Sequence, residues 1–188
     1  MTQTYRFINA QLDRPVVLVG MMGAGKTQIG KVLARNLNLG FADSDDEIVK
    51  AAGCAISDIF EFYGEGAFRD VEKKVLKRLV DDHTGVIATG GGAIVNDETR
   101  EYLLKNTIII WLDADIDTLF ERVSGHTHRP LLQTENPKER LQNLLESRNK
   151  YYEAAHIWVK SENVRFSETF QSVMSQLDSY LAQSSELE

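Results

Sequence analysis

Short apolar runs alternate along this chain with longer stretches in which apolar residues recur every three or four positions. Runs of the first kind are typical of buried strands, and stretches of the second kind indicate amphipathic helices. Strands are predicted over 15–19, 40–43, 86–89, 107–112 and 157–159, and helices over 26–38, 46–52, 137–155, 167–182 and after Phe68. Strands that alternate with helices favour an α/β fold with a parallel sheet.

The length of 188 residues fits a single domain over 1–188. We find no internal repeat, linker or low-complexity tract that would divide the chain. Residues 1–12 and 183–188 are expected to be loosely ordered, because nothing in their sequence ties either terminus down. The polar segment 125–135, between two helical patterns, is a candidate mobile lid.

Composition narrows the class of function. The chain is 43% hydrophobic and carries a net charge of −7, and its single cysteine, Cys54, cannot form an internal disulfide. No apolar run approaches the ~20 residues that a membrane helix needs, and no signal peptide is evident. These features predict a cytoplasmic protein without nucleic-acid or membrane partners. Any anion site must gather a few cations and backbone amides in one place.

The segment 20–27 matches the pattern of a phosphate-binding loop, and it follows an apolar strand and opens an amphipathic helix, as that pattern requires. Glycines let successive N–H groups surround phosphate oxygens, and the helix N-terminus adds positive charge. Lys26 is expected to reach the β- and γ-phosphates and the Thr27 hydroxyl to bind Mg²⁺. The predicted nucleotide contacts in this segment are Gly23, Ala24, Gly25, Lys26, Thr27 and Gln28.

Two aspartates, Asp43 and Asp45, follow the second predicted strand. If that strand continues to residue 45, the two side chains lie on the same side of the sheet. One carboxylate would then serve Mg²⁺ and the other an acceptor hydroxyl, which in phosphoryl transfer needs to be aimed more than deprotonated. The structural alternative is a helix N-cap, a role that Asp45 or Asp46 could fill.

An arginine and a glycine triplet elsewhere in the chain indicate a second ligand-binding region. Arg148 follows Leu141, Leu144 and Leu145 at helical spacing and so shares their apolar face, where an arginine needs a partner. A structural carboxylate is the simplest such partner. Three glycines end the strand 86–89, which is more than a tight turn needs and indicates close approach of a ligand.

Taken together, these motifs resemble the shikimate kinase family, and the resemblance extends from about residue 15 to residue 181. The residues that carry it are the loop 20–27, Asp43, Asp45, Phe68, Arg69, Glu72, Gly90, Gly91, Gly92, Arg129, Pro130, Leu131, Arg148, Tyr151 and Tyr152. The resemblance implies a three-layer fold with a five-stranded parallel sheet. It also implies ATP-dependent phosphorylation of the 3-hydroxyl of shikimate, in chorismate and aromatic amino acid biosynthesis, by a monomeric, Mg²⁺-dependent enzyme.

The resemblance also implies roles for single residues. Arg69 and Arg148 would grip the carboxylate of shikimate in a planar fork. Gly91 and Gly92 would present their amides to its ring. Asp45 is assigned to the acceptor hydroxyl, as a catalytic and substrate-binding residue, and Asp43 joins Thr27 as a metal ligand. An intrahelical pair with Glu72 is the structural reading of Arg69, and both readings can hold at once.

The remaining assignments concern the nucleotide. Arg129, in the lid, would reach the transferring phosphoryl group on closure and so act in catalysis with Lys26 and Asp45. Arg122 would stack on adenine. The segment 160–168 lacks the proline that the family often has there, and Arg165 is the residue of this segment that is expected to contact the base. His126 and His128 have no ligand-like spacing.

Two other functions remain open from the sequence. A related small-molecule kinase, such as gluconate kinase, would share the fold and the phosphate loop, although it would not be expected to carry arginines at both 69 and 148. A nucleotide-binding regulator that merely resembles the kinase is the second alternative. The presence of Asp45, Arg69 and Arg129 argues against lost catalysis.

Overall fold

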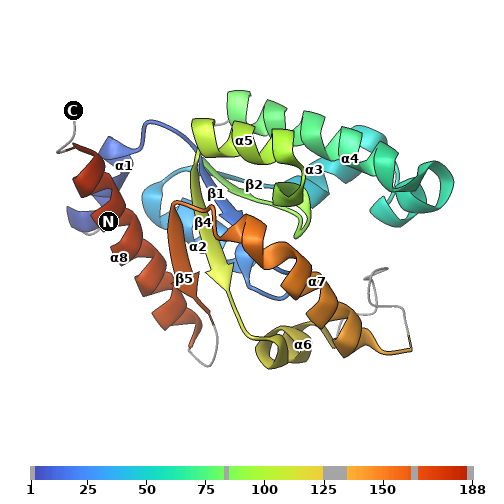
Figure 1. Ribbon diagram of the computed structural model, residues 1–188. Coiled ribbons are helices and arrows are strands. Elements are labelled where there is room, and N and C mark those ends of the chain that lie inside the picture. The colour runs from blue at the N-terminus through green and yellow to red at the C-terminus, as the bar shows by residue number, and fades with distance from the viewer. Residues whose placement is uncertain (1–2, 83–84, 125–134, 162–164, 186–188) are drawn as a thin grey trace.

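A parallel sheet of five strands forms the centre of the computed structural model, which describes residues 3–82, 85–124, 135–161 and 165–185. The strand order is β2-β3-β1-β4-β5, and every neighbouring pair is parallel (Figure 1). The strands are β1 (Val16–Val19), β2 (Gly40–Asp43), β3 (Gly85–Ala88), β4 (Ile108–Asp113) and β5 (Ile157–Lys160). All five predicted strands are confirmed, with ends that differ by at most one residue.

Helices cover both faces of the sheet. In Figure 1, the C-terminal end of α7 lies in front of the sheet near β4, α2 lies behind the strands, and α8 runs along β5. The helices are α1 (Gln3–Gln11), α2 (Lys26–Leu37), α3 (Ser44–Ala52), α4 (Ile56–Asp82), α5 (Asp97–Asn106), α6 (Ile116–Ser124), α7 (Pro137–Tyr152) and α8 (Phe166–Ser185), with a 3₁₀ turn, η1 (Ala93–Val95). This arrangement is the predicted three-layer α/β fold.

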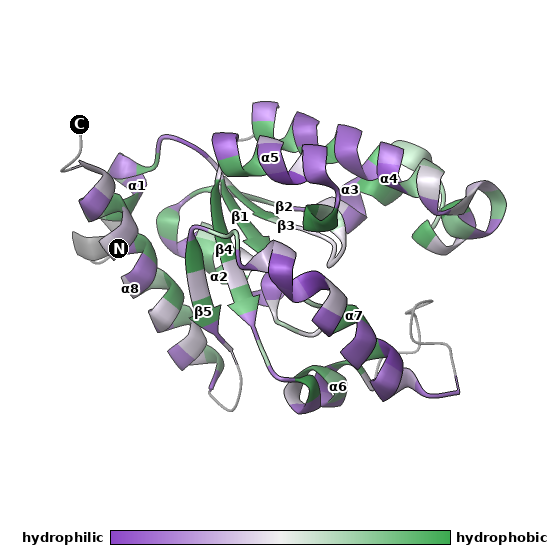
Figure 2. Ribbon diagram, viewed as in Figure 1, coloured by the Kyte–Doolittle hydropathy of each residue, from purple (hydrophilic) through white to green (hydrophobic). Residues whose placement is uncertain are grey.

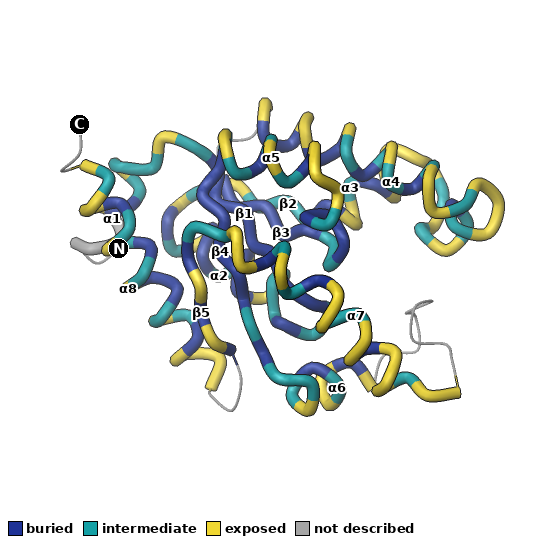
Figure 3. Tube along the Cα trace, viewed as in Figure 1, coloured by how far each residue is buried: buried dark blue, intermediate teal, exposed yellow. Residues whose placement is uncertain are grey.

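The core lies between the sheet and these helices. All residues of β1 and β3 are buried, and β4 is buried up to its last residue, as expected of central parallel strands that are covered on both faces. Figures 2 and 3 show the apolar strands enclosed by helices whose polar sides face outward. Within the described residues, no helix is both long and apolar enough to cross a membrane.

The chain termini correct one prediction. Residues 3–11 form α1 instead of a loose segment, because Ile8 is completely buried and Asn9 Nδ2 donates a 2.7 Å hydrogen bond to the carbonyl oxygen of Leu37. Helix α8 continues to Ser185, whose hydroxyl donates to Gln11 Oε1 at 3.1 Å. The expected loose tail is therefore helical over 183–185, and 186–188 lie outside the described residues.

Candidate active site

The phosphate loop joins the end of β1 to the start of α2. Gly20, Gly23 and Gly25 have φ values of 136°, 87° and 94°, which side-chain-bearing residues rarely adopt. A Cβ on Gly20 would also lie 2.4 Å from the carbonyl oxygen of Leu112. Gly25 is the N-cap residue of α2, so it places no side chain before the first amides of that helix. The loop therefore offers backbone N–H groups and the positive end of a helix dipole to an anion.

Lys26, the first residue of α2, lies across this loop. Its Nζ donates hydrogen bonds of 2.8 Å to the carbonyl oxygen of Gly20 and 2.9 Å to that of Met21. From this position, the Lys26 ammonium group can donate a hydrogen bond to a phosphate bound in the loop after only a small change in its side-chain orientation. Of the other predicted phosphate contacts, Ala24 is buried within the loop and Gln28 is exposed in the first turn of α2.

Two candidate metal ligands meet beside the loop. The Thr27 hydroxyl donates to Asp43 Oδ2 over 2.7 Å, which joins the first turn of α2 to the end of β2. A hydroxyl and a carboxylate are the oxygen donors that Mg²⁺ takes together with phosphates and water. Among the described residues, no cluster of three or more acidic, histidine or cysteine side chains could hold a metal by itself. This pair therefore fits an ion that arrives with a nucleotide.

The start of α3 corrects the sequence interpretation of the aspartates. Asp43 is the N-cap, because its Oδ1 accepts a 3.1 Å hydrogen bond from the amide of Asp45. The strand ends at Asp43, and Asp45 and Asp46 lie in the first turn of the helix. Strand alternation therefore does not relate Asp43 to Asp45, and neither Asp45 nor Asp46 is the cap. A short carboxylate at 43 satisfies a first-turn amide and starts the helix at once.

Arg69 and Glu72 form a pair on the buried side of α4. Arg69 Nη1 donates a 2.7 Å hydrogen bond to Glu72 Oε2, and Nη2 donates a 3.0 Å bond to Glu65 Oε1. The Glu72 side chain is only 4% exposed, whereas that of Glu65 is 68% exposed. Burial would lower the pKa of Arg69, but the two carboxylates outweigh it and raise this pKa. The intrahelical pair expected from the sequence is therefore present, and it holds the guanidinium in one orientation.

Glu72 is itself an unusual carboxylate. Burial raises its pKa, although Arg69 acts in the opposite direction and Asp45 adds to the rise. Its second oxygen, Oε1, is buried and has no hydrogen-bond partner among the described residues. A buried polar atom without a partner is costly and often marks a functional site.

The glycine triplet is the point where the acceptor-side groups converge. A Cβ on Gly92 would lie 2.7 Å from Nη2 of Arg69, and one on Gly91 would lie 3.6 Å from Nη1 of Arg148. A Cβ on Gly90 would lie 2.9 Å from Oδ1 of Asp45. Two cations and one carboxylate from three different helices therefore face one short stretch of backbone.

Arg148 is buried on the inner face of α7, as its spacing from the leucines predicts. Its Nη1 lies 4.0 Å from the weak acceptor Met21 Sδ, and its guanidinium also interacts with the Tyr152 hydroxyl and, through charge, with Glu72. None of the ion pairs between described residues includes Arg148. The simplest partner considered from the sequence, a structural carboxylate in direct contact, is thus not found there. A buried guanidinium of this kind suits an anionic ligand.

Tyr152 supports the same region and was not assigned a role from the sequence. It lies one turn after Arg148, where helical spacing could have identified it. Its hydroxyl donates to the carbonyl oxygen of Gly91, and its ring stacks on Trp111 with 5.7 Å between centroids. Burial raises the pKa of Tyr152 to about 12, so the hydroxyl stays protonated as a donor.

Arg122 connects the phosphate loop to the end of β5. Its Nη2 donates a 2.7 Å bond to the carbonyl oxygen of Ser161, and its Nη1 lies 3.3 Å from that of Gly23. The buried Ser161 also donates from Oγ to the carbonyl oxygen of Ala24 at 3.2 Å. Sequence reasoning missed Ser161, because only the strand order brings the end of β5 to this loop.

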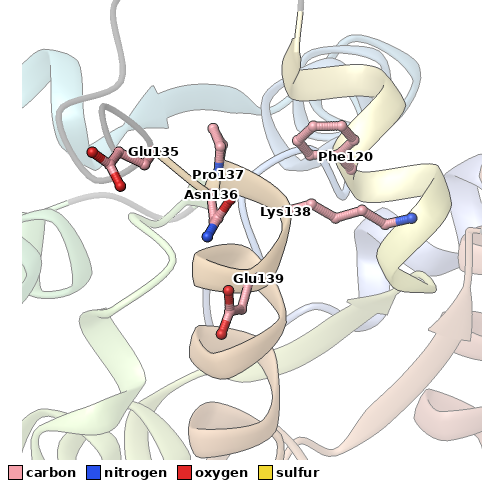
Figure 4. Close-up of a pocket in the computed structure, with 6 residues that line it drawn as sticks. All are labelled: Phe120, Glu135, Asn136, Pro137, Lys138 and Glu139. Atoms are coloured by element: carbon pink, nitrogen blue, oxygen red, sulfur yellow. The ribbon is translucent and has the colours of Figure 1, made fainter.

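The other predicted nucleotide contacts are less defined. Arg165 is exposed, and its amide donates to Glu168 Oε2 at 3.2 Å, a contact that is local to the start of α8. Arg129 and the lid residues 125–134 lie outside the described residues. Glu135, the last residue of the predicted lid, lines a cavity of about 360 Å³ at the start of α7 (Figure 4). That cavity contains none of the predicted catalytic or substrate-binding residues.

Comparison with known proteins identifies the family. The shikimate kinase family profile matches residues 22–178. A shikimate kinase of Bartonella quintana (strain Toulouse) is 44% identical over 182 residues, which cover 96% of this chain and 87% of the relative. One of Bartonella henselae is 45% identical over 169 residues, or 90% of this chain and 80% of the relative.

Solved structures agree with these matches. Shikimate kinase from Acinetobacter baumannii in complex with shikimate has a TM-score of 0.85 and 37% identity, and the match covers 96% of this chain and 99% of that chain. A gluconokinase from Sinorhizobium meliloti 1021, with a TM-score of 0.58 and 16% identity, shares the fold alone. The chain therefore belongs to the shikimate kinase family.

Proposed function

We propose that this protein transfers the γ-phosphate of ATP to the 3-hydroxyl of shikimate, giving shikimate 3-phosphate and ADP for chorismate and aromatic amino acid biosynthesis. The observation that carries the proposal is the convergence of Arg69 and Arg148 on Gly91 and Gly92, beside Asp45. Shikimate offers a carboxylate to the two arginines and hydroxyl groups to the aspartate. Family membership supports the same acceptor.

On the donor side, the loop amides and Lys26 hold the β- and γ-phosphates. Thr27 and Asp43 would supply the protein ligands of Mg²⁺, which would neutralise phosphate charge during transfer. Arg122 lies at the nucleotide end of the site, where it contacts both the loop and Ser161. Arg129 and Arg165 are proposed as further nucleotide contacts on the basis of the family motifs.

On the acceptor side, Arg69 and Arg148 bind the carboxylate and Gly91 and Gly92 let the ring approach the backbone. Asp45 accepts a hydrogen bond from the 3-hydroxyl and aims its oxygen at the γ-phosphorus. Phosphoryl transfer depends mainly on such alignment, so an ordinary aspartate suffices.

We further propose that the enzyme acts as a monomer in the cytoplasm. The support is its composition, with one cysteine and a net charge of −7, and the family resemblance.

The deciding experiment measures ADP release from ATP and Mg²⁺ with shikimate, with gluconate and with no acceptor, in parallel. We expect release that depends on shikimate, with Lys26→Ala as the control for contaminating ATPase activity. Turnover with gluconate alone would indicate the related kinase. ADP binding without turnover on either acceptor would indicate a nucleotide-binding regulator.

A further inference from the structure

Ser44 stands between the two aspartates and has no role in the proposed chemistry. It is completely buried, whereas Asp45 beside it is exposed. Its Oγ accepts a 3.0 Å hydrogen bond from the amide of Gly90. The ladder between β2 and β3 ends with Asp43 opposite Ala88, so this bond extends the contact between the two segments past the last paired residues.

Gly90 leaves space for neighbouring side chains and is not needed for backbone freedom, so a Cβ there would make the Asp45 side chain shift. The φ of Gly90 is not among the positive values of the chain. A Cβ at this position would lie 2.9 Å from Asp45 Oδ1 and 3.1 Å from Glu72 Oε1, and real Cβ atoms essentially never approach within 3.0 Å. The oxygens of two carboxylates thus occupy the space that any side chain at 90 would take.

These two features act in the same sense on one distance, the separation between the first turn of α3 and the end of β3. The Ser44 bond draws the first turn of α3 toward the end of β3, and the missing Cβ lets the Asp45 carboxylate enter the gap. The Glu72 carboxylate, which is bonded to Arg69, forms the other side of that gap. The separation of Asp45 from Arg69 therefore depends on Ser44 and Gly90.

We propose that Ser44 and Gly90 are positioning residues, a spacer that fixes the Asp45 carboxylate relative to the Arg69–Glu72 pair. The inference rests on the proposed role of Asp45 at the acceptor hydroxyl. A hydroxyl that must align with a phosphorus atom is sensitive to displacements of about 1 Å, which can cost roughly 100-fold in rate. The spacer is therefore a determinant of kcat more than of nucleotide binding.

The test begins with Ser44→Ala and Gly90→Ala. Loss of the Ser44 bond should lower kcat roughly 5- to 10-fold, and displacement of Asp45 by a Cβ at 90 should lower it about 100-fold. ADP affinity, measured by calorimetry, should stay within about 2-fold of wild type and shows that each variant is folded. Gly66→Ala is the matched control, because a Cβ there has no neighbour within 4 Å and Gly66 is exposed on α4.

A double-mutant cycle separates positioning from a general structural role. In an Asp45→Ala background, measured by single turnover over hours, Ser44→Ala should cost less than about 2-fold further. If Ser44→Ala and Gly90→Ala both keep the wild-type kcat, the proposed spacer role is wrong. It is also wrong if Ser44→Ala lowers kcat equally in the wild-type protein and in the Asp45→Ala variant. Normal turnover in Asp45→Ala alone would instead overturn the proposed role of Asp45, and the spacer with it.

Discussion

Arg69 is held by two carboxylates of very different exposure, Glu72 at 2.7 Å and Glu65 at 3.0 Å. Both lie on α4, one turn after and one turn before the arginine, so the local sequence offers them as equivalent partners. The environment separates them, because the buried Glu72 side chain keeps its charge interaction away from water and the exposed Glu65 does not. Glu72 is thus the partner that sets the orientation of the guanidinium.

This difference gives a matched pair of variants. Glu72→Gln should raise the KM for shikimate roughly 10- to 100-fold, the scale of removing one partner of a buried charge pair. Glu65→Gln should change it less than about 3-fold, because exposed pairs contribute little. Steady-state kinetics with saturating ATP measures both. Equal effects of the two substitutions would contradict the assignment of Glu72 as the orienting residue.

Arg148 should recognise the negative charge of the acceptor. Arg148→Leu removes a buried guanidinium that has no ion-pair partner among the described side chains, so its loss should weaken shikimate binding by roughly 2–4 kcal/mol. ATP affinity should change little. Calorimetric titration of shikimate into the ADP complex measures the effect.

Shikimate amide provides the control for that experiment, because it keeps the ring and hydroxyls but lacks the carboxylate charge. The wild-type enzyme should discriminate strongly against the amide, and Arg148→Leu should lose most of this discrimination. If the amide binds wild type as well as shikimate does, neither Arg148 nor Arg69 reads the carboxylate.

The Thr27–Asp43 contact should appear in the magnesium dependence. Thr27→Val keeps the side-chain shape but removes the hydroxyl that lies 2.7 Å from Asp43 Oδ2. The Mg²⁺ concentration for half-maximal activity should rise about 10-fold or more, since even indirect ligand contacts contribute that much. Thr27→Ser keeps the oxygen and should behave as wild type. An unchanged Mg²⁺ dependence in Thr27→Val would remove this residue from the metal site.

The features that were predictable from the sequence are those that depend on local spacing. Apolar runs located the five strands, the loop pattern located the bend before Lys26, and helical spacing placed Arg148 on the buried face of α7. In each case the residues that define the feature lie within about two helical turns of one another. Such short-range patterns can be recognised without knowing which distant segments of the chain pack against them.

The features that escaped prediction depend on which segments become neighbours. Helix α1 forms because Ile8 finds a buried site, and Ser161 acquires its role because β5 ends beside the phosphate loop. Ser44 looks like an ordinary polar residue until β3 brings Gly90 within 3.0 Å of it. Asp43 is a residue type that often caps helices. It was not predicted as the cap because it is also the last residue of a strand, and α3 begins at the very next residue.

Stability should depend on pH through His156. Its Nδ1 accepts a 2.9 Å hydrogen bond from the amide of Ile109, where β5 joins β4, and only an unprotonated nitrogen can accept. Burial, with Arg14 as a second cause, lowers the pKa of His156 below its ordinary value of 6.5. The ring also packs at 5.8 Å from Tyr180 of α8, so the neutral form belongs to the folded state.

The sign follows from the depressed pKa. At pH values between the folded pKa of His156 and 6.5, the unfolded chain binds more protons than the folded one. The contribution of His156 to the free energy of unfolding is therefore fully present above pH 6.5. It is lost as the pH falls through the folded pKa. His156→Asn should flatten this dependence. Between pH 7.5 and 5 we expect wild type to lose about 1–3 °C more in Tm than the variant, since a domain of this size moves roughly 2–4 °C per kcal/mol. The other histidines are common to both proteins, so parallel Tm curves would show that His156 does not carry the effect.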